Sequence, residues 1–104
     1  MAKREVIELL KKFITLLKTE GFLVEKAFLY GSYLTNTATS NSDIDLLLVT
    51  DDANDDDSVG KIWSLTQKVS TKIEPFLVTK DRFYFSENSP LIESIKTNGL
   101  EIFS

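Results

Sequence analysis

The stretch that decides the fold runs from Gly31 to Val49 and reads GSYLTNTATSNSDIDLLLV. One apolar segment ends just before it, and a second begins at the sequence Asp43-Ile44-Asp45. Side chains alternate across a strand, so the two aspartates lie on one face with Cα atoms about 6.5–7 Å apart. The stretch therefore predicts a strand, a turn and a second strand that begins with two aligned carboxylates.

Two aligned carboxylates repel each other unless water or a cation neutralises them. A divalent cation resolves this repulsion, and oxygen ligands suit Mg²⁺, which retains waters and bridges substrate phosphates. An Asp-x-Asp sequence by itself also fits an ordinary strand start in which Asp43 caps a turn. Both interpretations therefore remain open on this feature alone.

The Gly31-Ser32 pair stands where the first apolar segment ends. A glycine there lets the backbone turn sharply and approach a ligand closely. If a helix begins after Ser32, its free N–H groups and the serine hydroxyl form an anion site. The alternative is an ordinary strand-to-helix turn with a serine cap.

The amino-acid composition excludes several kinds of catalytic and metal site. The chain has 104 residues and a net charge of −4, with neither cysteine nor histidine. Disulfides, thiolate or histidine-ligated zinc and imidazole catalysis are therefore excluded. The acidic balance makes a long nucleic acid an unfavourable partner. The charged N-terminus and the lack of an apolar run of membrane-spanning length predict a cytoplasmic protein.

Hydrophobic periodicity predicts the remaining elements. Helices are expected over residues 4–18, 32–37, 59–71 and 90–99, and strands over residues 22–30, 43–50, 73–79 and 100–103. Trp63 and Leu91 are expected to face inward. This order predicts the α/β or α+β class, with a small mixed sheet flanked by helices in one domain over residues 1–104.

The whole constellation is more specific than its parts. An apolar strand, Gly-Ser, ten residues and Asp-x-Asp on a second apolar strand resemble the signature of the DNA polymerase β-like nucleotidyltransferases. The chain is most similar to the minimal nucleotidyltransferases; the motif covers residues 28–49, and the layout covers most of the chain. The resemblance implies a polymerase β palm-like fold that transfers a nucleoside monophosphate, AMP in first place, from an NTP to an acceptor hydroxyl.

The resemblance also implies roles for individual residues. Asp43 and Asp45 would hold two Mg²⁺ ions, while Gly31 and Ser32 would cradle the β- and γ-phosphates. Pyrophosphate would leave. Tyr33, directly after the Gly-Ser pair, fits a place in the core or an interface, and it is also the aromatic residue to test for contact with the nucleotide.

The family has a third carboxylate on the strand after Asp-x-Asp, and Glu74 is the candidate here. It is the single acidic residue of the segment 73–79, and Pro75 favours extended geometry at Glu74. Its implied roles are metal ligand and base for the acceptor hydroxyl. The alternative is a solvated glutamate on an edge strand, which proline also marks.

One segment departs from the family pattern. Where the family often reads Ala-Arg-Gly, this chain has Leu34, Thr35 and Asn36. Asn36 can adopt the left-handed conformation of a glycine. The missing arginine removes a candidate phosphate contact, so the departure bears on nucleotide affinity and not on the carboxylate chemistry.

The acidic run DDANDDD, residues 51–57, suggests a calcium loop. Counting from Asp52, the sixth position is Asp57 instead of glycine and the twelfth is Trp63 instead of glutamate, which excludes an EF-hand. We expect a solvated loop whose charge favours the N-terminus of the next helix.

Three functions follow from the sequence. The first is the Mg²⁺-dependent nucleotidyltransferase. The second is an interaction protein, since minimal nucleotidyltransferases are often paired with a helical HEPN-class partner in toxin–antitoxin arrangements, and so short a chain offers no acceptor-binding domain. The third is a degenerate fold that binds a nucleotide without turnover. The apolar stripe of the first helix fits either the core of the domain or the interface of a dimer, so the oligomeric state stays open.

Overall fold

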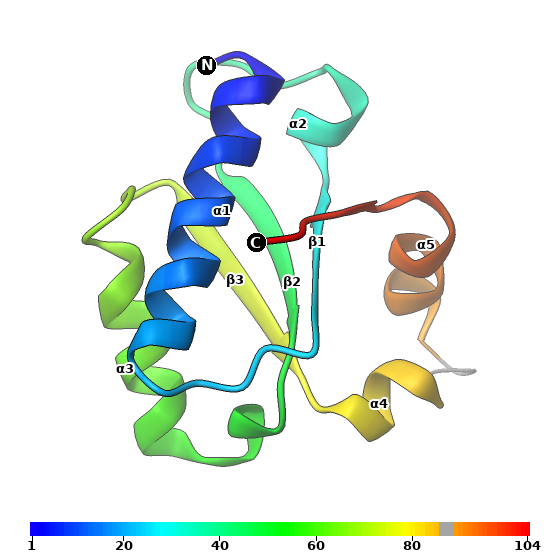
Figure 1. Cartoon of the computed structure of the whole chain (residues 1–104). Helices are drawn as coiled ribbons and strands as arrows, with labels where there is room; N and C mark the ends of the chain where they lie inside the picture. Colours follow the sequence, from blue (N-terminus) through cyan, green and yellow to red (C-terminus); the bar gives the residue numbers. More distant parts are fainter. Residues whose placement is uncertain (86–88) are drawn as a thin grey trace.

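The computed structural model describes residues 1–85 and 89–104, and in them a four-stranded mixed sheet has helices on both faces (Figure 1). The strands are β1 (Lys26–Tyr30), β2 (Ile44–Val49), β3 (Ile73–Val78) and β4 (Leu100–Glu101), in the order β3-β2-β1-β4. β1 is antiparallel to β2 and β4, whereas β2 and β3 are parallel. The predicted fold class is confirmed.

The helices form two layers around this sheet. They are α1 (Lys3–Thr19), α2 (Ser32–Thr35), the 3-10 turn η1 (Asp51–Asn54), α3 (Asp56–Thr66), α4 (Lys80–Tyr84) and α5 (Pro90–Asn98). α1 and α3 pack on one face, and α4 and α5 pack on the other. Within the described residues, no helix has the length and apolar character needed to cross a membrane.

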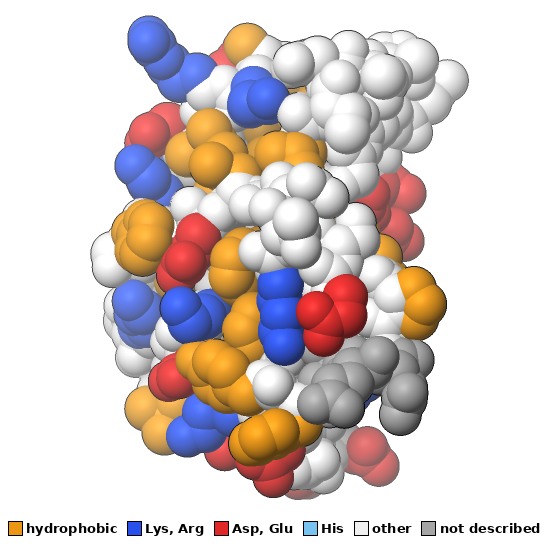
Figure 2. Space-filling view, turned by 90° about the vertical axis from the view of Figure 1, so that its right-hand side faces the viewer, with side chains coloured by type: hydrophobic (Ala, Val, Ile, Leu, Met, Phe, Trp, Pro, Cys, Tyr) orange, Lys and Arg blue, Asp and Glu red, His pale blue; other side chains and the backbone are white. Residues whose placement is uncertain are grey.

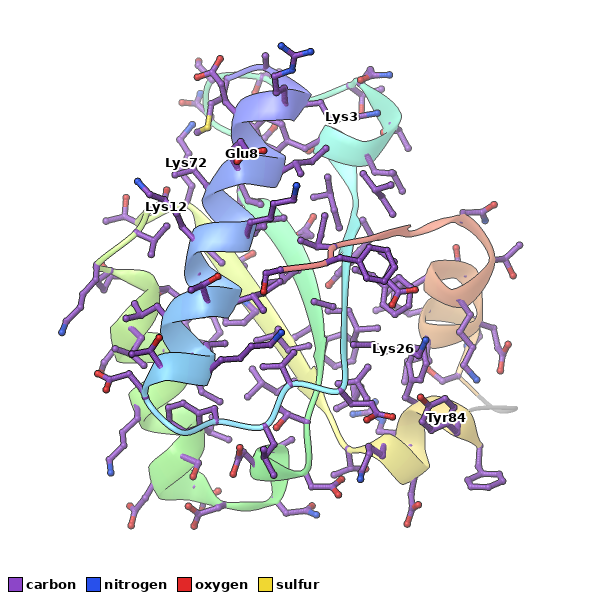
Figure 3. The ribbon with its side chains drawn as sticks, in the orientation of Figure 1. Lys3, Glu8, Lys12, Lys26, Lys72 and Tyr84 are labelled. Carbon is purple, nitrogen blue, oxygen red and sulfur yellow. The ribbon has the colours of Figure 1, made fainter. Side chains whose placement is uncertain are left out.

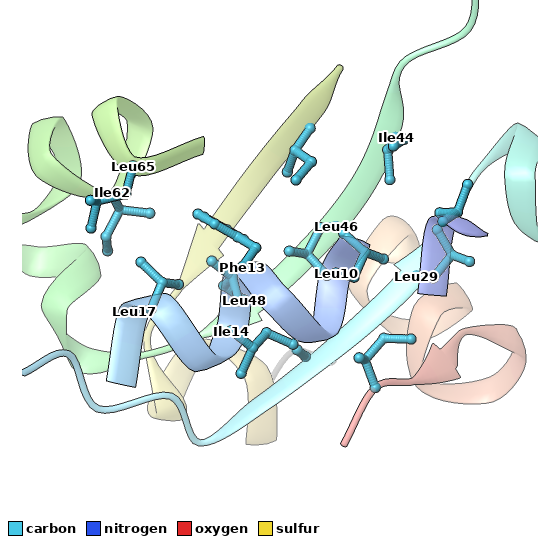
Figure 4. Packing of buried hydrophobic residues seen from close by; sticks show 14 of the residues in the cluster. Leu10, Phe13, Ile14, Leu17, Leu29, Ile44, Leu46, Leu48, Ile62 and Leu65 are labelled. Atoms are coloured by element: carbon cyan, nitrogen blue, oxygen red, sulfur yellow. The ribbon is translucent and has the colours of Figure 1, made fainter. Parts of the chain in front are cut away.

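β2 is apolar on both faces, as its continuous hydrophobic sequence predicts. Leu46 and Leu48 are fully buried against α1 and α3, where Phe13 and Ile62 fill the space between the layers (Figure 4). Leu47 is equally buried in the other cluster, which α4 and α5 cover. The alternation of β2 therefore fixes which residues share a face with Asp45.

The first strand is shorter than predicted because the end of α1 uses part of its sequence. Gly21 adopts φ +92°, and its N–H donates to the carbonyl of Lys18. The N–H of Phe22 donates to the carbonyl of Leu17 at 2.9 Å. This pair of hydrogen bonds is the Schellman motif that closes a helix. β1 accordingly begins at Lys26 instead of Phe22.

Two predicted core residues are largely exposed. Trp63 retains 42% of its surface and Leu91 retains 48%. α3 begins three residues earlier than predicted, with Asp55 as its cap, and it buries Ile62 and Leu65 instead of Trp63. The sequence analysis did not predict α4, whose Phe83 is buried between α4 and the sheet.

Candidate active site

Two of the predicted carboxylates, Asp45 and Glu74, lie side by side on paired strands at one end of the sheet. Tyr30 of β1 pairs with Asp45 of β2, and Asp45 pairs with Glu74 of β3. Residues that pair across neighbouring strands point to the same face. Tyr30, Asp45 and Glu74 therefore form one row, which we call the carboxylate row, on the face that α4 and α5 partly cover.

The charges of this row interact through space. Burial raises the pKa of Asp45, and the nearby charges of Glu74 and Asp43 raise it further. Burial, then Asp45 and Glu74, raises the pKa of the Tyr30 phenol in the same way. The acidic groups are thus close enough to repel one another, and no cation within residues 1–85 and 89–104 offsets the repulsion at Asp45.

Asp43 lies just before β2, at the end of a loop that is tied to β3. The Lys72 ammonium donates to the carbonyl of Ser40 at 2.7 Å, and the Ile44 N–H donates to the carbonyl of Lys72 at 2.8 Å. Figure 3 shows Lys72 on the segment that leads into β3. These contacts hold the end of the Asp43 loop beside the start of the strand that carries Glu74.

The carboxylates fit a divalent cation by their chemistry. Among the residues that the structure describes, Asp43, Asp45 and Glu74 have neither a hydrogen-bond donor nor a cationic partner. In the same residues, no three acidic side chains converge closely enough to hold one ion as they stand. Asp43 and Glu74 are exposed, so their side chains have room to turn. Unpaired, mutually repelling oxygens are the donor set that Mg²⁺ accepts.

Gly31 lies directly against this donor set. Its backbone has φ +78° and ψ −154°, a conformation that is essentially restricted to glycine. A Cβ atom at this position would collide with the Asp45 carboxylate. The sharp turn predicted at Gly31 is confirmed, and the structure adds a second reason for glycine, which is the room it leaves beside Asp45.

The residues after Gly31 form the short helix α2. Ser32 is its first residue, and within the described chain its hydroxyl has no hydrogen-bond partner. Asn36 ends the helix at φ 61° and ψ 30°, so the left-handed conformation expected there is confirmed. Asn36 therefore occupies a left-handed conformation that glycine adopts readily.

Tyr33 lies apart from the carboxylate row. Only 4% of its surface is exposed, and it packs in the core between the sheet and α1. Its hydroxyl is buried without a partner among the described residues, and its side chain borders a cavity of about 220 Å³ beside Asn36 and Ala38. Its contact with a nucleotide stays a prediction.

Glu74 of the carboxylate row is exposed, whereas Asp45 and Tyr30 are half-buried. A cavity of about 550 Å³ occurs at the opposite end of the sheet, between the end of α1 and α3, where Phe22, Asp52 and Leu65 are among its lining residues. None of the predicted site residues lines it. We nevertheless choose the carboxylate row as the candidate site, because its unpaired carboxylates suit a metal ion and the residues that line the cavity are not those of the family motif.

Sequence reasoning missed three side chains on the carboxylate face: Tyr30, Phe76 and Arg82. Tyr30 and Phe76 are half-buried at the border of the cluster under α4 and α5. Residues two apart on a strand share a face, so the sequence of β3 already indicated that Phe76 lies on the face of Glu74. Arg82 could not be found in this way, because it lies on the unpredicted helix α4.

The raised pKa of Asp45 predicts a pH-dependent effect on stability. The folded state holds the Asp45 proton more tightly than the unfolded state, so ionisation of this group destabilises the fold. The destabilisation is absent at low pH and grows as the pH rises through the raised pKa. Asp45→Asn should therefore be more stable than wild type at neutral pH, by on the order of 0.5 kcal/mol because the group is partly solvated.

Thermal unfolding of both proteins in a chelator, from pH 3 to pH 8, measures this difference. The gap in Tm should be near zero at the acidic end and should open in favour of the variant toward neutral pH. A variant that is less stable than wild type at neutral pH would contradict the repulsion inferred at the carboxylate row.

Comparisons with known proteins identify the family and the fold. A family model described as a nucleotidyltransferase domain matches residues 7–101. A solved structure from Sulfolobus solfataricus, provisionally described as a nucleotidyltransferase, shares the fold with a TM-score of 0.58 and 14% sequence identity, covering 77% of this chain and 72% of that chain. No match was found among curated proteins. The family model spans α1 to β4 and includes every predicted site residue, and the chain belongs to the nucleotidyltransferase domain family.

Proposed function

We propose that the chain, as a single minimal nucleotidyltransferase domain over residues 1–104, transfers AMP from ATP to an acceptor hydroxyl and releases pyrophosphate. Membership of the family supports the reaction class. The observation that carries the finer proposal is the pairing of Asp45 with Glu74 beside Gly31, with no cation to neutralise the carboxylates among the described residues.

Asp43, Asp45 and Glu74 are the proposed ligands of two Mg²⁺ ions. Their oxygens are unpaired and repel one another, which makes binding of divalent cations favourable. Bound ions of this kind stabilise the attacking and leaving oxygens of an in-line displacement.

Residues of the chain itself bind the phosphates and accept the proton of the acceptor. Gly31 leaves space for a phosphate beside Asp45, and the Ser32 hydroxyl donates a hydrogen bond to that phosphate. The oxygen of the acceptor hydroxyl forms a bond to the α-phosphorus, and Glu74 accepts the proton that this hydroxyl loses. The bond from the α-phosphorus to the bridging oxygen then breaks, and the pyrophosphate leaves with the electron pair. Tyr33 would reach the nucleotide only after α2 moves, since its side chain is buried.

A transfer assay tests this proposal. ATP, CTP, GTP and UTP, each labelled at the α-phosphate, are incubated with Mg²⁺ and the protein, with and without extract of the native cell. The wild type and the control Asp57→Asn, an exposed aspartate of α3, should label an acceptor, most strongly from ATP. The double variant Asp43→Asn/Asp45→Asn should not. Equal transfer by the double variant would overturn the assignment, and tight Mg-NTP binding without turnover would indicate a binding protein.

A second candidate function is the modification of a partner protein, such as the HEPN-class partner of a toxin–antitoxin pair. The observation that favours it is the exposure of Tyr84, Phe85 and Leu91 around α4 and α5, with Phe85 at 78%. Figure 2 shows apolar side chains among charged ones on the side of the molecule that carries α5. Label that migrates with a protein would support this function, whereas label on a small molecule would contradict it.

The same apolar side chains could instead pair two copies of the chain. Light scattering on the purified protein and on Phe85→Ser distinguishes these cases. A dimer that the substitution dissociates would indicate self-association. A monomer in both samples would favour binding of a different protein at these side chains.

A further inference from the structure

Arg82 of α4 lies over the sheet face that carries the carboxylate row, above Phe76 of β3. The guanidinium carbon of Arg82 is 5.3 Å from the centre of the Phe76 ring. Phe76 follows Glu74 by two residues on β3, so the two side chains share a face about 6.5–7 Å apart along the strand. Arg82 therefore lies over the residue that follows Glu74 on this face of β3, toward the end of the strand that leads into α4.

The charge of Arg82 is uncommitted, unlike that of the nearby lysines. Lys80 pairs with Asp51 at 3.6 Å, and Lys96 pairs with Glu93 at 3.7 Å. Lys26, beside Tyr84 in Figure 3, forms an ion pair with a β4 carboxylate at 3.7 Å. In the described part of the chain, the Arg82 guanidinium has no ion pair and no hydrogen bond.

The backbone of Arg82 is held in α4, while its exposed side chain keeps its donors unused among the described residues. The Thr79 hydroxyl accepts the backbone N–H of Arg82 and caps α4. The neighbouring Phe83 is buried and stacks on Phe28, with ring centres 5.5 Å apart. A guanidinium that lies over a ring still presents its edge, where its N–H groups can bind a carboxylate or phosphate through two hydrogen bonds.

We propose that Arg82 binds an anionic group, a phosphate or a carboxylate, on the acceptor that receives the nucleotide. This proposal rests on the proposed transferase function. In the sheet, Gly31 and Ser32 follow β1, whereas Glu74 and Phe76 belong to β3, on the other side of β2. Arg82, over Phe76, thus lies on the β3 side of the site, whereas the proposed phosphate cradle follows β1.

The positive charge of Arg82 would favour an acceptor that carries a negative charge. The chain is acidic, and an anionic acceptor that approaches the carboxylate row meets the charges of Asp45 and Glu74. The Arg82 guanidinium, farther along β3, offers the anionic group of such an acceptor a bidentate partner away from these carboxylates. The acceptor class is accordingly a hydroxyl compound that carries its own negative charge.

Titration of the free protein with simple anions tests the site without catalysis. The chain has two arginines, Arg4 and Arg82, so both Nε–H signals can be resolved by NMR in ¹⁵N-labelled protein, and Arg82→Lys assigns them. Inorganic phosphate is the first probe and acetate the second. We expect a saturable shift of the Arg82 signal with at least one probe, while Arg4 follows ionic strength alone. The responding probe identifies the phosphate or the carboxylate; an Arg82 signal that only tracks Arg4 in both titrations would overturn the proposal.

Kinetics then links the site to the acceptor identified by the transfer assay. Loss of a charged hydrogen-bonding partner should raise the KM for the acceptor by about 10- to 100-fold in Arg82→Gln and leave the KM for ATP unchanged. Arg82→Lys should retain part of the effect, and Lys80→Gln serves as the matched control. A higher KM for ATP alone, or no change, would overturn the proposal. A wild type without transfer would contradict the proposed function instead, and the phosphate and acetate titrations would still decide the role of Arg82.

Discussion

Replacing Asp45 by asparagine is expected to lower the rate of nucleotidyl transfer by about 10³-fold or more while the protein stays folded. Asp45 is central in the carboxylate row, between Tyr30 and Glu74, and its carboxylate lies against Gly31. Bound metal ions stabilise a phosphoryl-transfer transition state by several kcal/mol. A loss of about 4 kcal/mol of that stabilisation corresponds to about 10³-fold in rate.

Single-turnover transfer from labelled ATP measures this loss, with circular dichroism as the check on folding. Asp57→Asn is the matched control, because it makes the same chemical change on an exposed part of α3. Transfer by Asp45→Asn within 10-fold of the control would mean that Asp45 is not a metal ligand. The expected combination of lost activity and unchanged or higher stability would separate a functional role from a structural one.

The sequence was sufficient for the parts of the site that depend on local order. The apolar content of β2 indicated burial on both sides, which the structure confirms. Strand alternation predicted one face for Asp43 and Asp45, but β2 begins only at Ile44, so for Asp43 this stays a prediction. Glycine chemistry predicted the turn at Gly31, and asparagine chemistry predicted the left-handed residue at Asn36. Each of these predictions needs only a few neighbouring residues.

The parts that depend on strand pairing required the structure. Glu74 was proposed from its family position, but its pairing with Asp45 depends on the parallel register of β2 and β3. The contact between Gly31 and Asp45 joins residues fourteen positions apart, across two antiparallel strands. No local pattern encodes such registers, since they arise when the two strands share a core.

Arg82 shows the same limit for helices. α4 is five residues long, too short to have a recognisable hydrophobic period. It is held by Thr79 at its start and by the stacking of Phe83 on Phe28, which is a tertiary contact. Short helices of this kind are stabilised by packing more than by propensity. The position of the guanidinium over Phe76 could therefore be seen only in the structure.

Replacing Gly31 by alanine is expected to lower both stability and activity, for two separable reasons. Its φ of +78° with ψ of −154° is a region that side chains strain, at about 1–3 kcal/mol. The added Cβ atom would also displace the Asp45 carboxylate, and a displacement of about 1 Å in a reacting group can lower a rate by about 10²-fold. Denaturant unfolding and the transfer assay measure the two effects.

Gly21 provides the matched control for the strain alone. Its φ is +92°, and a Cβ atom there would meet nothing within 4 Å. Gly21→Ala should therefore lose about 1–2 kcal/mol of stability and keep its transfer rate. If Gly31→Ala kept its activity as Gly21→Ala does, the contact between Gly31 and Asp45 would have no bearing on catalysis.

A double-mutant cycle isolates the contact itself. In the Asp45→Ala background the carboxylate that the new Cβ atom meets is absent, so Gly31→Ala should retain only the cost of backbone strain, as in Gly21→Ala. Residues in direct contact typically show coupling energies of about 0.5–3 kcal/mol. A coupling energy of zero would mean that the carboxylate moves aside freely, and the loss of activity in Gly31→Ala would then have to come from the phosphate side of the turn. A positive coupling would show that Gly31 both forms the turn after β1 and sets the position of the central carboxylate.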